Sequence, residues 1–297
     1  MIMKKMIALM TAAVLAVASL AGCGGGSADE TTEAVTTEAA GDSTEAEADD
    51  TAAADDTTAA SEESDMAYVQ DKGTLVVGVT NFEPMDYLDE SGEWIGFDAD
   101  LAKAFGESLG VEVEFVEIDW DNKVLELDSH TIDCVWNGMT LTDEVLGAME
   151  CSNAYCNNAQ IVIVPADVAD QYQDVDSLSD LTFAVEAGSA GEEQVSALGL
   201  NYTPVTSQAD ALMEVAAGTS DAAVIDSLMA AAMVGEGTSY ADLTYTIGLN
   251  SEEYGVGFRM GSDLAAALND FFAQSYADGS MQELAATYGV QAAIIEQ

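Results

Sequence analysis

The chain has 297 residues and is strongly acidic, with 55 Asp and Glu residues against 6 Lys and Arg residues. This balance excludes the basic surface that phosphate binding requires, so we expect no nucleic-acid partner. Hydrophobic residues make up 49% of the chain, which is ample for a globular core once the terminal segments are set aside.

Residues 1–22 have the pattern of a secretory leader. Lys4 and Lys5 form a charged start, and residues 6–20 form an apolar, alanine-rich stretch that is short for a membrane span. The leader ends in Leu-Ala-Gly followed by Cys23, which resembles a bacterial lipobox. That resemblance implies cleavage before Cys23 and lipidation of its sulfur. We therefore expect a lipid-anchored protein on the outer face of the bacterial cytoplasmic membrane; a plain signal peptide with an incidental cysteine is the alternative.

The segment after Cys23 has a different composition. Residues 24–66 are rich in Gly, Ser, Ala, Thr, Asp and Glu, and they contain no Lys or Arg. Such a segment buries too little apolar surface to offset its ordering entropy, and its charges repel one another. We expect residues 23–66 to be a disordered acidic tether. An acidic tract that sequesters metal ions is the alternative, but no ligand spacing supports it.

From Tyr68 onward, predicted strands and helices alternate. We expect a buried strand at residues 75–79, a loop at 82–87, a helix from about residue 98, a half-exposed strand at 111–115 and a short helix that Trp120 and Asp121 open. A second series follows, with strands at 159–164, 182–185, 222–225, 243–249 and 255–259. A helix starts at residue 188, and further helices are expected at 209–217, 262–277 and 280–288. This alternation predicts α/β lobes with largely parallel sheets.

Residues 132–145 combine three signals. Residues 132–136 predict a short buried strand, Asn137 and Gly138 predict a turn, and Thr142 predicts the N-cap of a helix that continues to about residue 150. In open α/β sheets, ligands bind just outside the carboxyl ends of the strands. This stretch is therefore a candidate binding segment, with an ordinary strand–helix connection as the alternative.

Six short motifs follow one another along the domain. They are Gly-Phe-Asp-Ala-Asp-Leu at 96–101, Ile-Asp-Trp-Asp at 118–121, Asn-Gly-Met-Thr-Leu-Thr at 137–142, Ser-Asn-Ala-Tyr at 152–155, Val-Glu-Ala-Gly-Ser at 185–189 and Asp-Ala-Ala-Val-Ile-Asp at 221–226. In this order, from Leu75 to the C-terminus, they resemble the extracellular solute-binding proteins of polar amino-acid ABC importers, family 3.

The resemblance implies a two-lobed α/β fold of the periplasmic-binding-protein-like type II, with a ligand cleft between the lobes and two hinge strands. Lobe one would comprise residues 67–158 plus 254–297, and lobe two residues 159–253. The chain would cross between the lobes near Asn158 and Glu253. Closure of such a cleft around a solute is a hinge motion.

Residues of lobe one that match the family's ligand positions form the first half of the candidate site. Phe82 and Trp120 match two aromatic side chains that sandwich the aliphatic part of the ligand. Gly138 matches a position that offers a backbone group, Thr140 matches one that offers a hydroxyl, and Asn137 lies beside them. For the two aromatic residues, a plain role in the core is the alternative.

Residues of lobe two supply the other half. Ser189 and Ala190 match a helix start that grips the α-carboxylate of the ligand through free N–H groups. Asp226 matches the acidic residue that takes the ammonium group. A buried carboxylate is costly without a partner, which favours this role. For Ser189 and Asp226, a simple N-cap is the alternative.

One position departs from the family pattern. The family has an arginine three residues after the motif threonine, where it holds the ligand carboxylate, and this chain has Val145 there. None of the remaining cations, Lys72, Lys103, Lys123 and Arg259, matches a pocket position, and only Arg259 is left open as a cation that reaches the site from elsewhere. Either the carboxylate is held by helix N–H groups alone, or the ligand has no carboxylate. We therefore expect neutral or cationic solutes rather than acidic ones.

After lipidation of Cys23, three cysteines remain. Cys151 and Cys156 are close enough in sequence to pair, and Cys134 lies in a predicted strand. An odd number allows at most one internal disulfide, and we favour buried free thiols. His130 is the only histidine, so we expect neither a metal site nor any cofactor.

These patterns favour a monomeric substrate-binding lipoprotein, not an enzyme, which captures an amino-acid-like polar solute and delivers it to the permease of an ABC importer. Two other functions stay open. An enzyme on the same fold, such as a dehydratase, would use an acid such as Asp226 or Glu186, but no base with an oriented partner is evident. A ligand-sensing ectodomain would need a partner that carries the signal.

Overall fold

The computed structural model describes residues 64–297, and in these residues the longer strands form two separate sheets. The first sheet has the strand order β4-β1-β5-β13-β6, and β7 also pairs with β13. Their bounds are β1 Thr74–Val79, β4 Glu112–Glu117, β5 Cys134–Thr140, β6 Glu150–Cys151, β7 Cys156–Asn158 and β13 Glu252–Phe258. Strand β1 is parallel to β4 and β5, whereas β13 is antiparallel to β5.

Helices and a small strand pair complete this half of the domain, residues 64–158 and 252–297, which we call lobe one. They are α1 Asp65–Lys72, β2 Tyr87–Leu88, β3 Trp94–Ile95, α2 Phe97–Leu109, the 3-10 turn η1 Trp120–Asn122, α3 Lys123–Asp128, α4 Asp143–Ala148, α8 Leu264–Asp278 and α9 Ser280–Thr287.

The second sheet, with its helices, forms lobe two, residues 160–248. Its strand order is β10-β9-β11-β8-β12. The elements are β8 Gln160–Pro165, η2 Ala169–Gln171, η3 Val175–Leu178, β9 Thr182–Glu186, α5 Ala190–Ala197, β10 Asn201–Val205, α6 Gln208–Ala217, β11 Ala222–Asp226, α7 Ser227–Met233 and β12 Leu243–Gly248.

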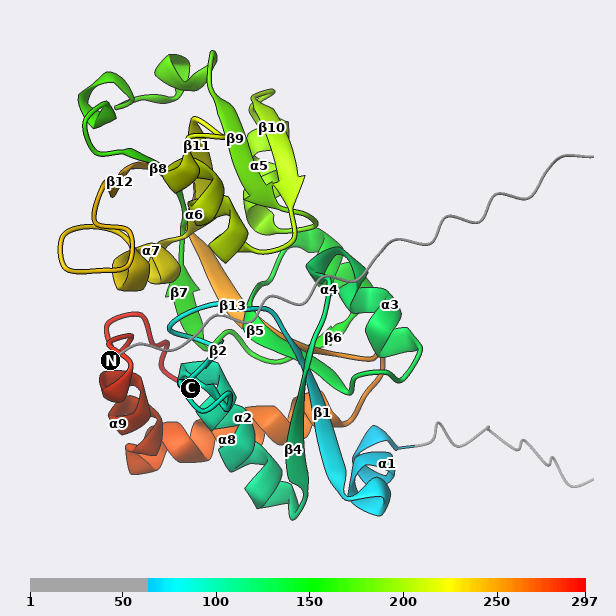
Figure 1. Ribbon diagram of the computed structural model, residues 1–297. Coiled ribbons are helices and arrows are strands. Elements are labelled where there is room, and N and C mark those ends of the chain that lie inside the picture. Colours follow the sequence, from blue (N-terminus) through cyan, green and yellow to red (C-terminus); the bar gives the residue numbers. More distant parts are fainter. Residues whose placement is uncertain (1–63) are drawn as a thin grey trace, which may run out of the picture. The chain divides into compact units, whose positions relative to one another are not determined.

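The chain passes between the sheets twice. It leaves lobe one between β7 and β8, at residue 159, and returns between β12 and β13, at residues 249–251. Strands β7 and β13 pair antiparallel, with Asn158 opposite Glu252, so the two crossing segments lie side by side (Figure 1). A pair of connections of this kind allows the lobes to bend toward each other, and it restricts their sliding or twisting past each other.

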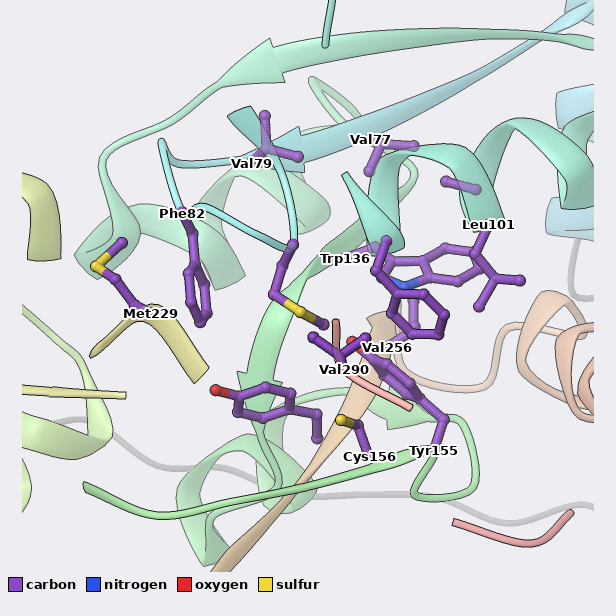
Figure 2. Close-up of a cluster of buried hydrophobic side chains, with 14 of the residues drawn as sticks. Val77, Val79, Phe82, Leu101, Trp136, Tyr155, Cys156, Met229, Val256 and Val290 are labelled. Carbon is purple, nitrogen blue, oxygen red and sulfur yellow. The ribbon is translucent and has the colours of Figure 1, made fainter. Parts of the chain in front are cut away.

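The largest hydrophobic core continues from lobe one into lobe two. In lobe one, the buried indole of Trp136 meets the rings of Phe272 and Phe105 edge-on, with ring centroids 5.7 and 6.2 Å apart. The same cluster includes Phe82 and Met229, the latter from α7 of lobe two (Figure 2). Aromatic pairs in this geometry add to the free energy gained by burial, so they stabilise the core of lobe one.

Helix α1 attaches the start of the described chain to lobe one. The Ser64 hydroxyl and the Met66 backbone N–H both donate to the carboxylate of Asp263, at 2.5 and 2.8 Å. Asp65 forms an ion pair with Arg259, with Nε and Oδ2 3.1 Å apart. The leader, Cys23 and nearly all of the tether lie outside the described residues. Within residues 64–297, no helix is long and apolar enough to cross a membrane.

The predicted turn at Asn137 and Gly138 is wrong. Strand β5 continues through both residues to Thr140, because β13 supplies an antiparallel partner that a local pattern does not reveal. Gly138 has a φ of 55°, and the register of β5 against β13 shifts between Gly255 and Gly257. The left-handed backbone at Gly138 is therefore a local irregularity within the strand. Thr142 then caps α4 as expected.

Candidate functional site

A cavity of about 370 Å³ lies between the two lobes. Residues from β5, η1 and α4 line it on the side of lobe one, and residues from β9, α5, α6 and β11 line it on the side of lobe two. Seven of the eight predicted ligand positions line it: Trp120, Asn137, Gly138, Thr140, Ser189, Ala190 and Asp226. The volume is within the range of small-molecule sites.

The end of β5 forms the floor of the cavity on the lobe-one side. The side chain of Asn137 is fixed, since its Nδ2 donates to Asp86 Oδ2 at 2.8 Å and its Oδ1 accepts from the Thr80 hydroxyl at 2.8 Å. The backbone N–H of Gly138 donates to Asp98 Oδ2 at 2.7 Å. The side-chain amide of Asn137 and the backbone N–H of Gly138 are therefore already hydrogen-bonded, and the buried carboxyls of Asp86 and Asp98 fix their positions.

Asp86 and Asp98, which hold these two residues, are fully buried carboxyls. Burial raises the pKa of Asp98 to about 7, and burial together with repulsion from Asp98 raises the pKa of Asp86 well above its usual value. In the described part of the chain, Oδ1 of each has no hydrogen-bond partner. The pair therefore retains protons under conditions in which exposed carboxyls are ionised.

Phe82 is placed differently from the expectation, because it lies outside the set of described residues that line the cavity. Its ring is buried, meets Tyr254 edge-on at 6.3 Å, and packs against Gly138. A Cβ atom at Gly138 would come within 2.5 Å of Phe82 Cε1. Phe82 thus packs against the back of the floor, and Trp120 is the one predicted aromatic residue in the lining.

Lys123 is a cation of the cavity lining, although it matches none of the family's ligand positions. It lines the cavity beside Trp120, with its Nζ 5.0 Å from the indole centroid. Its ammonium donates to the carbonyl oxygens of Trp120, at 3.2 Å, and of Gly188, at 2.9 Å. Gly188 belongs to lobe two, so Lys123 connects the lobes, and burial lowers the pKa of its ammonium.

The start of α5 is capped from within the chain. Ser189 Oγ accepts from the N–H of Glu192 at 3.1 Å, and Glu192 Oε2 accepts from the N–H of Gly188 at 2.7 Å. The two bonds satisfy the N–H of Glu192 in the first turn and the N–H of Gly188, which precedes the N-cap. The carboxylate of Glu192 also neutralises part of the positive end of the helix dipole. The N-cap alternative for Ser189 is therefore realised, although Ser189 and Ala190 also line the cavity.

Asp226 ends β11, is 3% exposed, and is surrounded by side-chain amides. Its Oδ1 accepts from Asn158 and, at 2.8 Å, from Gln160, and its Oδ2 accepts from Gln208. Asn158 and Gln160 flank the first crossing, so the carboxyl is tied to the hinge. Asp226 precedes α7, but its side chain makes no capping bond to that helix.

Glu252, at the start of β13, is the second carboxyl of this network. Its Oε1 accepts from the Thr140 hydroxyl at 2.9 Å, from Asn158 at 2.7 Å and from Gln160 at 2.8 Å. Burial and then repulsion from Glu252 raise the pKa of Asp226 to about 8. The two carboxyls share the amide donors of Asn158 and Gln160, one on each side of the first crossing. Their negative charge at the hinge is therefore reduced either by a proton or by a bound cation.

Glu186, named above only as a possible acid of an enzyme, lies in the cavity although it was not among the predicted ligand-binding residues. It ends β9, is 2% exposed and lines the cavity. Burial and then repulsion from Asp226 raise its pKa to about 8, and the nearby Lys123 opposes this. A carboxylate directly after an apolar strand was the signal, the same one that pointed to Asp226. Lys123, Gln160 and Gln208 carried no comparable signal. Lysine and glutamine are common on protein surfaces, so their presence in the sequence does not mark a binding site.

Val145 and Arg259 add no positive charge to the described lining. Val145, on α4, lines the cavity at the position of the family arginine. Arg259 is bound elsewhere in lobe one, where it pairs with Asp65 and, at 3.4 Å, with Asp133. Within residues 64–297, no cluster of three or more His, Cys, Asp or Glu residues is arranged to hold a metal ion, and Cys134, Cys151 and Cys156 are free thiols.

Comparison with known proteins gives the same assignment from independent data. The family model of the bacterial extracellular solute-binding proteins, family 3, matches residues 75–291. The L-cystine-binding protein of Escherichia coli strain K12 is 27% identical over 220 residues, which cover 73% of this chain and 82% of that protein.

Solved structures agree. An ancestral amino acid-binding protein, described as a precursor of cyclohexadienyl dehydratase, superposes with a TM-score of 0.70 at 30% identity and covers 76% of this chain and 99% of its own. A histidine-bound substrate-binding protein of an ABC uptake transporter from Streptococcus pneumoniae superposes with a TM-score of 0.70 at 28% identity, covering 78% and 98%. The fold is that of the two-lobed type II binding proteins, and the chain belongs to the bacterial extracellular solute-binding proteins, family 3.

Proposed function

We propose that this chain is the substrate-binding lipoprotein of an ABC importer and that it captures an amino-acid-like polar solute, neutral or cationic, for delivery to the permease. The carrying observation is that seven family ligand positions, from both lobes, surround one cavity at the crossings. The relatives named above are binding proteins, and we propose capture without catalysis. Capture would proceed by closure of the two lobes around the solute.

Each lining group has a chemical role in this proposal. The indole of Trp120 covers the aliphatic part of the solute and excludes water. Thr140 donates its hydroxyl hydrogen to Glu252, so its oxygen remains an acceptor for a ligand N–H. Asp226 takes the ammonium, and the exposed N–H groups near Ser189 and Ala190 face any carboxylate.

A thermal-shift screen of amino acids, amines and small peptides tests capture directly. A ligand present at 100 times its Kd stabilises the folded state by about 2.7 kcal/mol. In a domain of this size, that raises Tm by about 5–10 °C. We expect such shifts from neutral or cationic solutes and none from glutamate or aspartate. Tight glutamate binding would contradict the assignment.

We further propose that Cys23 is the lipidated residue and that residues 23–63 tether the domain to the membrane, because residues 64–66, expected in the tether, belong to the start of α1 on lobe one. The supporting pattern is the lipobox-like sequence before Cys23. The Cys23→Ala variant should be released from the membrane fraction, whereas Ser27→Ala, a substitution in the proposed tether, should remain there. Retention of the Cys23→Ala protein after normal cleavage of the leader would disprove the anchor.

A further inference from the structure

We propose, building on the capture function above, that the cavity is suited to a solute with two cationic groups and no carboxylate, such as a diamine or a guanidino-amine. Asp226 would bind one cationic group and Glu186 the other. Glu186 is then the residue that determines specificity, because it distinguishes a dication from a solute with a single ammonium.

The first support is an unmet acceptor on Glu186. This side chain is 2% exposed, yet it lines the cavity. Among the residues that the structure describes, its Oε1 has no hydrogen-bond partner. A buried polar atom without a partner is costly, and such atoms are uncommon in folded proteins. A ligand N–H in the cavity would satisfy it.

The second support is the state of Asp226. An ionised carboxyl offers about four acceptor sites. Three amide donors, from Asn158, Gln160 and Gln208, already occupy sites on Asp226. Among the described residues, this leaves one acceptor site, which adjoins the Tyr254 hydroxyl, so Asp226 has room for a single ligand N–H at most. A solute with two cationic groups needs a second carboxyl, and Glu186 lies close enough to Asp226 to feel its charge.

The third support is that the described lining has no basic side chain free to hold a carboxylate. The family arginine is replaced by Val145, and Glu192 already occupies the N–H of Gly188 at the start of α5. Lys123 is the one basic residue of the described lining, and it is bound to two carbonyl oxygens. Six acidic residues share that lining: Asp121, Glu144, Glu186, Glu192, Glu193 and Asp226. A ligand carboxylate would meet net negative charge, whereas a dication would be attracted.

Titration calorimetry on the full chain at about pH 8 tests the proposal with two matched pairs. Each pair shares its cationic groups and differs by one carboxylate: 1,4-diaminobutane against ornithine, and agmatine against arginine. We expect each carboxylate-free member to bind at least about tenfold more tightly than its amino acid, as one unfavourable charged contact predicts.

Variants assign the second cation. Glu186→Gln should weaken 1,4-diaminobutane binding by at least about tenfold, because it removes the charge while it keeps the shape. Glu114→Gln, an exposed position on β4 outside the cavity, should leave binding unchanged. Thermal unfolding of both variants in parallel shows that they are folded, and the matched pairs on the natural chain remain informative whatever the variants do.

The outcomes separate this proposal from the capture function. If ornithine and arginine bind as tightly as their carboxylate-free partners or more tightly, the proposal of a dicationic ligand without a carboxylate is wrong, and the proposal of amino-acid capture stands. Unchanged diamine binding by Glu186→Gln overturns the role of Glu186. If neither the amines nor any of the amino acids of the thermal-shift screen bind, both proposals fall.

Discussion

The ammonium of Lys123 in lobe one donates a 2.9 Å hydrogen bond to the carbonyl oxygen of Gly188 in lobe two. At the same point the backbones nearly touch, since a Cβ atom at Gly188 would come within 2.8 Å of Asp121 Cα. The two lobes therefore meet across the mouth of the cavity, which is the arrangement of a closed cleft.

Replacement of Gly188 tests whether this contact limits closure. We expect Gly188→Ala to weaken ligand binding at least about tenfold, because the added methyl group holds Asp121 away and binding energy is then lost. Gly199→Ala is the matched control, since Gly199 has a similar φ of 67° against 69° but open space around it. Titration calorimetry measures both. Equal effects of the two substitutions would attribute the loss to backbone strain instead of closure.

Val145→Arg should create the missing carboxylate site. A charge-assisted hydrogen bond contributes about 1.5–3 kcal/mol, so affinity for ordinary α-amino acids should rise about tenfold to a hundredfold. Val145→Met adds length without charge and serves as the control. No gain with arginine at this position would indicate that the carboxylate, if there is one, binds elsewhere.

Asp226→Ala should abolish binding of any amine, because it removes the carboxyl that takes the first ammonium. It also leaves the side-chain amide of Gln208 without its acceptor, while Asn158 and Gln160 keep only Glu252, so a lower Tm is expected as well. Asp221→Asn, at the exposed residue that precedes β11, is the control for loss of charge, because its amide oxygen can still accept from the N–H of Thr182. Undiminished binding by a folded Asp226→Ala protein would reject the assignment.

Ligand affinity should depend on pH. Burial raises the pKa of both Asp226 and Glu186 to about 8, so both carry protons at neutral pH in the empty cavity. Lys123 and Asp226 face Glu186, while Glu252 and Tyr254 face Asp226. A cationic ligand favours the ionised carboxylates, so binding displaces protons and becomes tighter as the pH rises toward about 8.

Each displaced proton contributes up to about a tenfold gain in affinity per pH unit below that pKa. Calorimetry in two buffers with different ionisation enthalpies counts the protons that are released. Glu186→Gln should reduce that count, and Glu114→Gln should not. A flat profile between about pH 6 and pH 8 would mean that the carboxyls are already ionised when the cavity is empty.

Much of the fold was predictable because its signals are local. The strand at 75–79 and the helices at 209–217 and 262–277 appear within a few residues of their predicted bounds. Partners distant in sequence decided the rest. β5 extends through Asn137 and Gly138 because β13 pairs with it, and β10 exists although it contains Pro204, which is tolerated at the edge of a sheet.

The site shows the same division. Trp120 and Asp226 were found from motif positions, and both line the cavity. Phe82 was not separable from a core residue by sequence, since the outcome depends on how closely Gly138 allows its ring to approach from behind. Lys123 reaches the cavity only because lobe two presents the carbonyl of Gly188 to it, a contact across 65 residues of sequence.

The fastening of α1 has a mechanical consequence. The chain enters the domain at Ser64, which is bound to Asp263, and Asp65 is paired with Arg259, so the entry point belongs to lobe one. If residues 23–63 link the domain to a lipid, any pull along them is borne by lobe one and does not pass through the paired crossings at Asn158 and Glu252. Motion of lobe two about the crossings is then independent of the anchor, and a force along the tether neither opens nor closes the cleft.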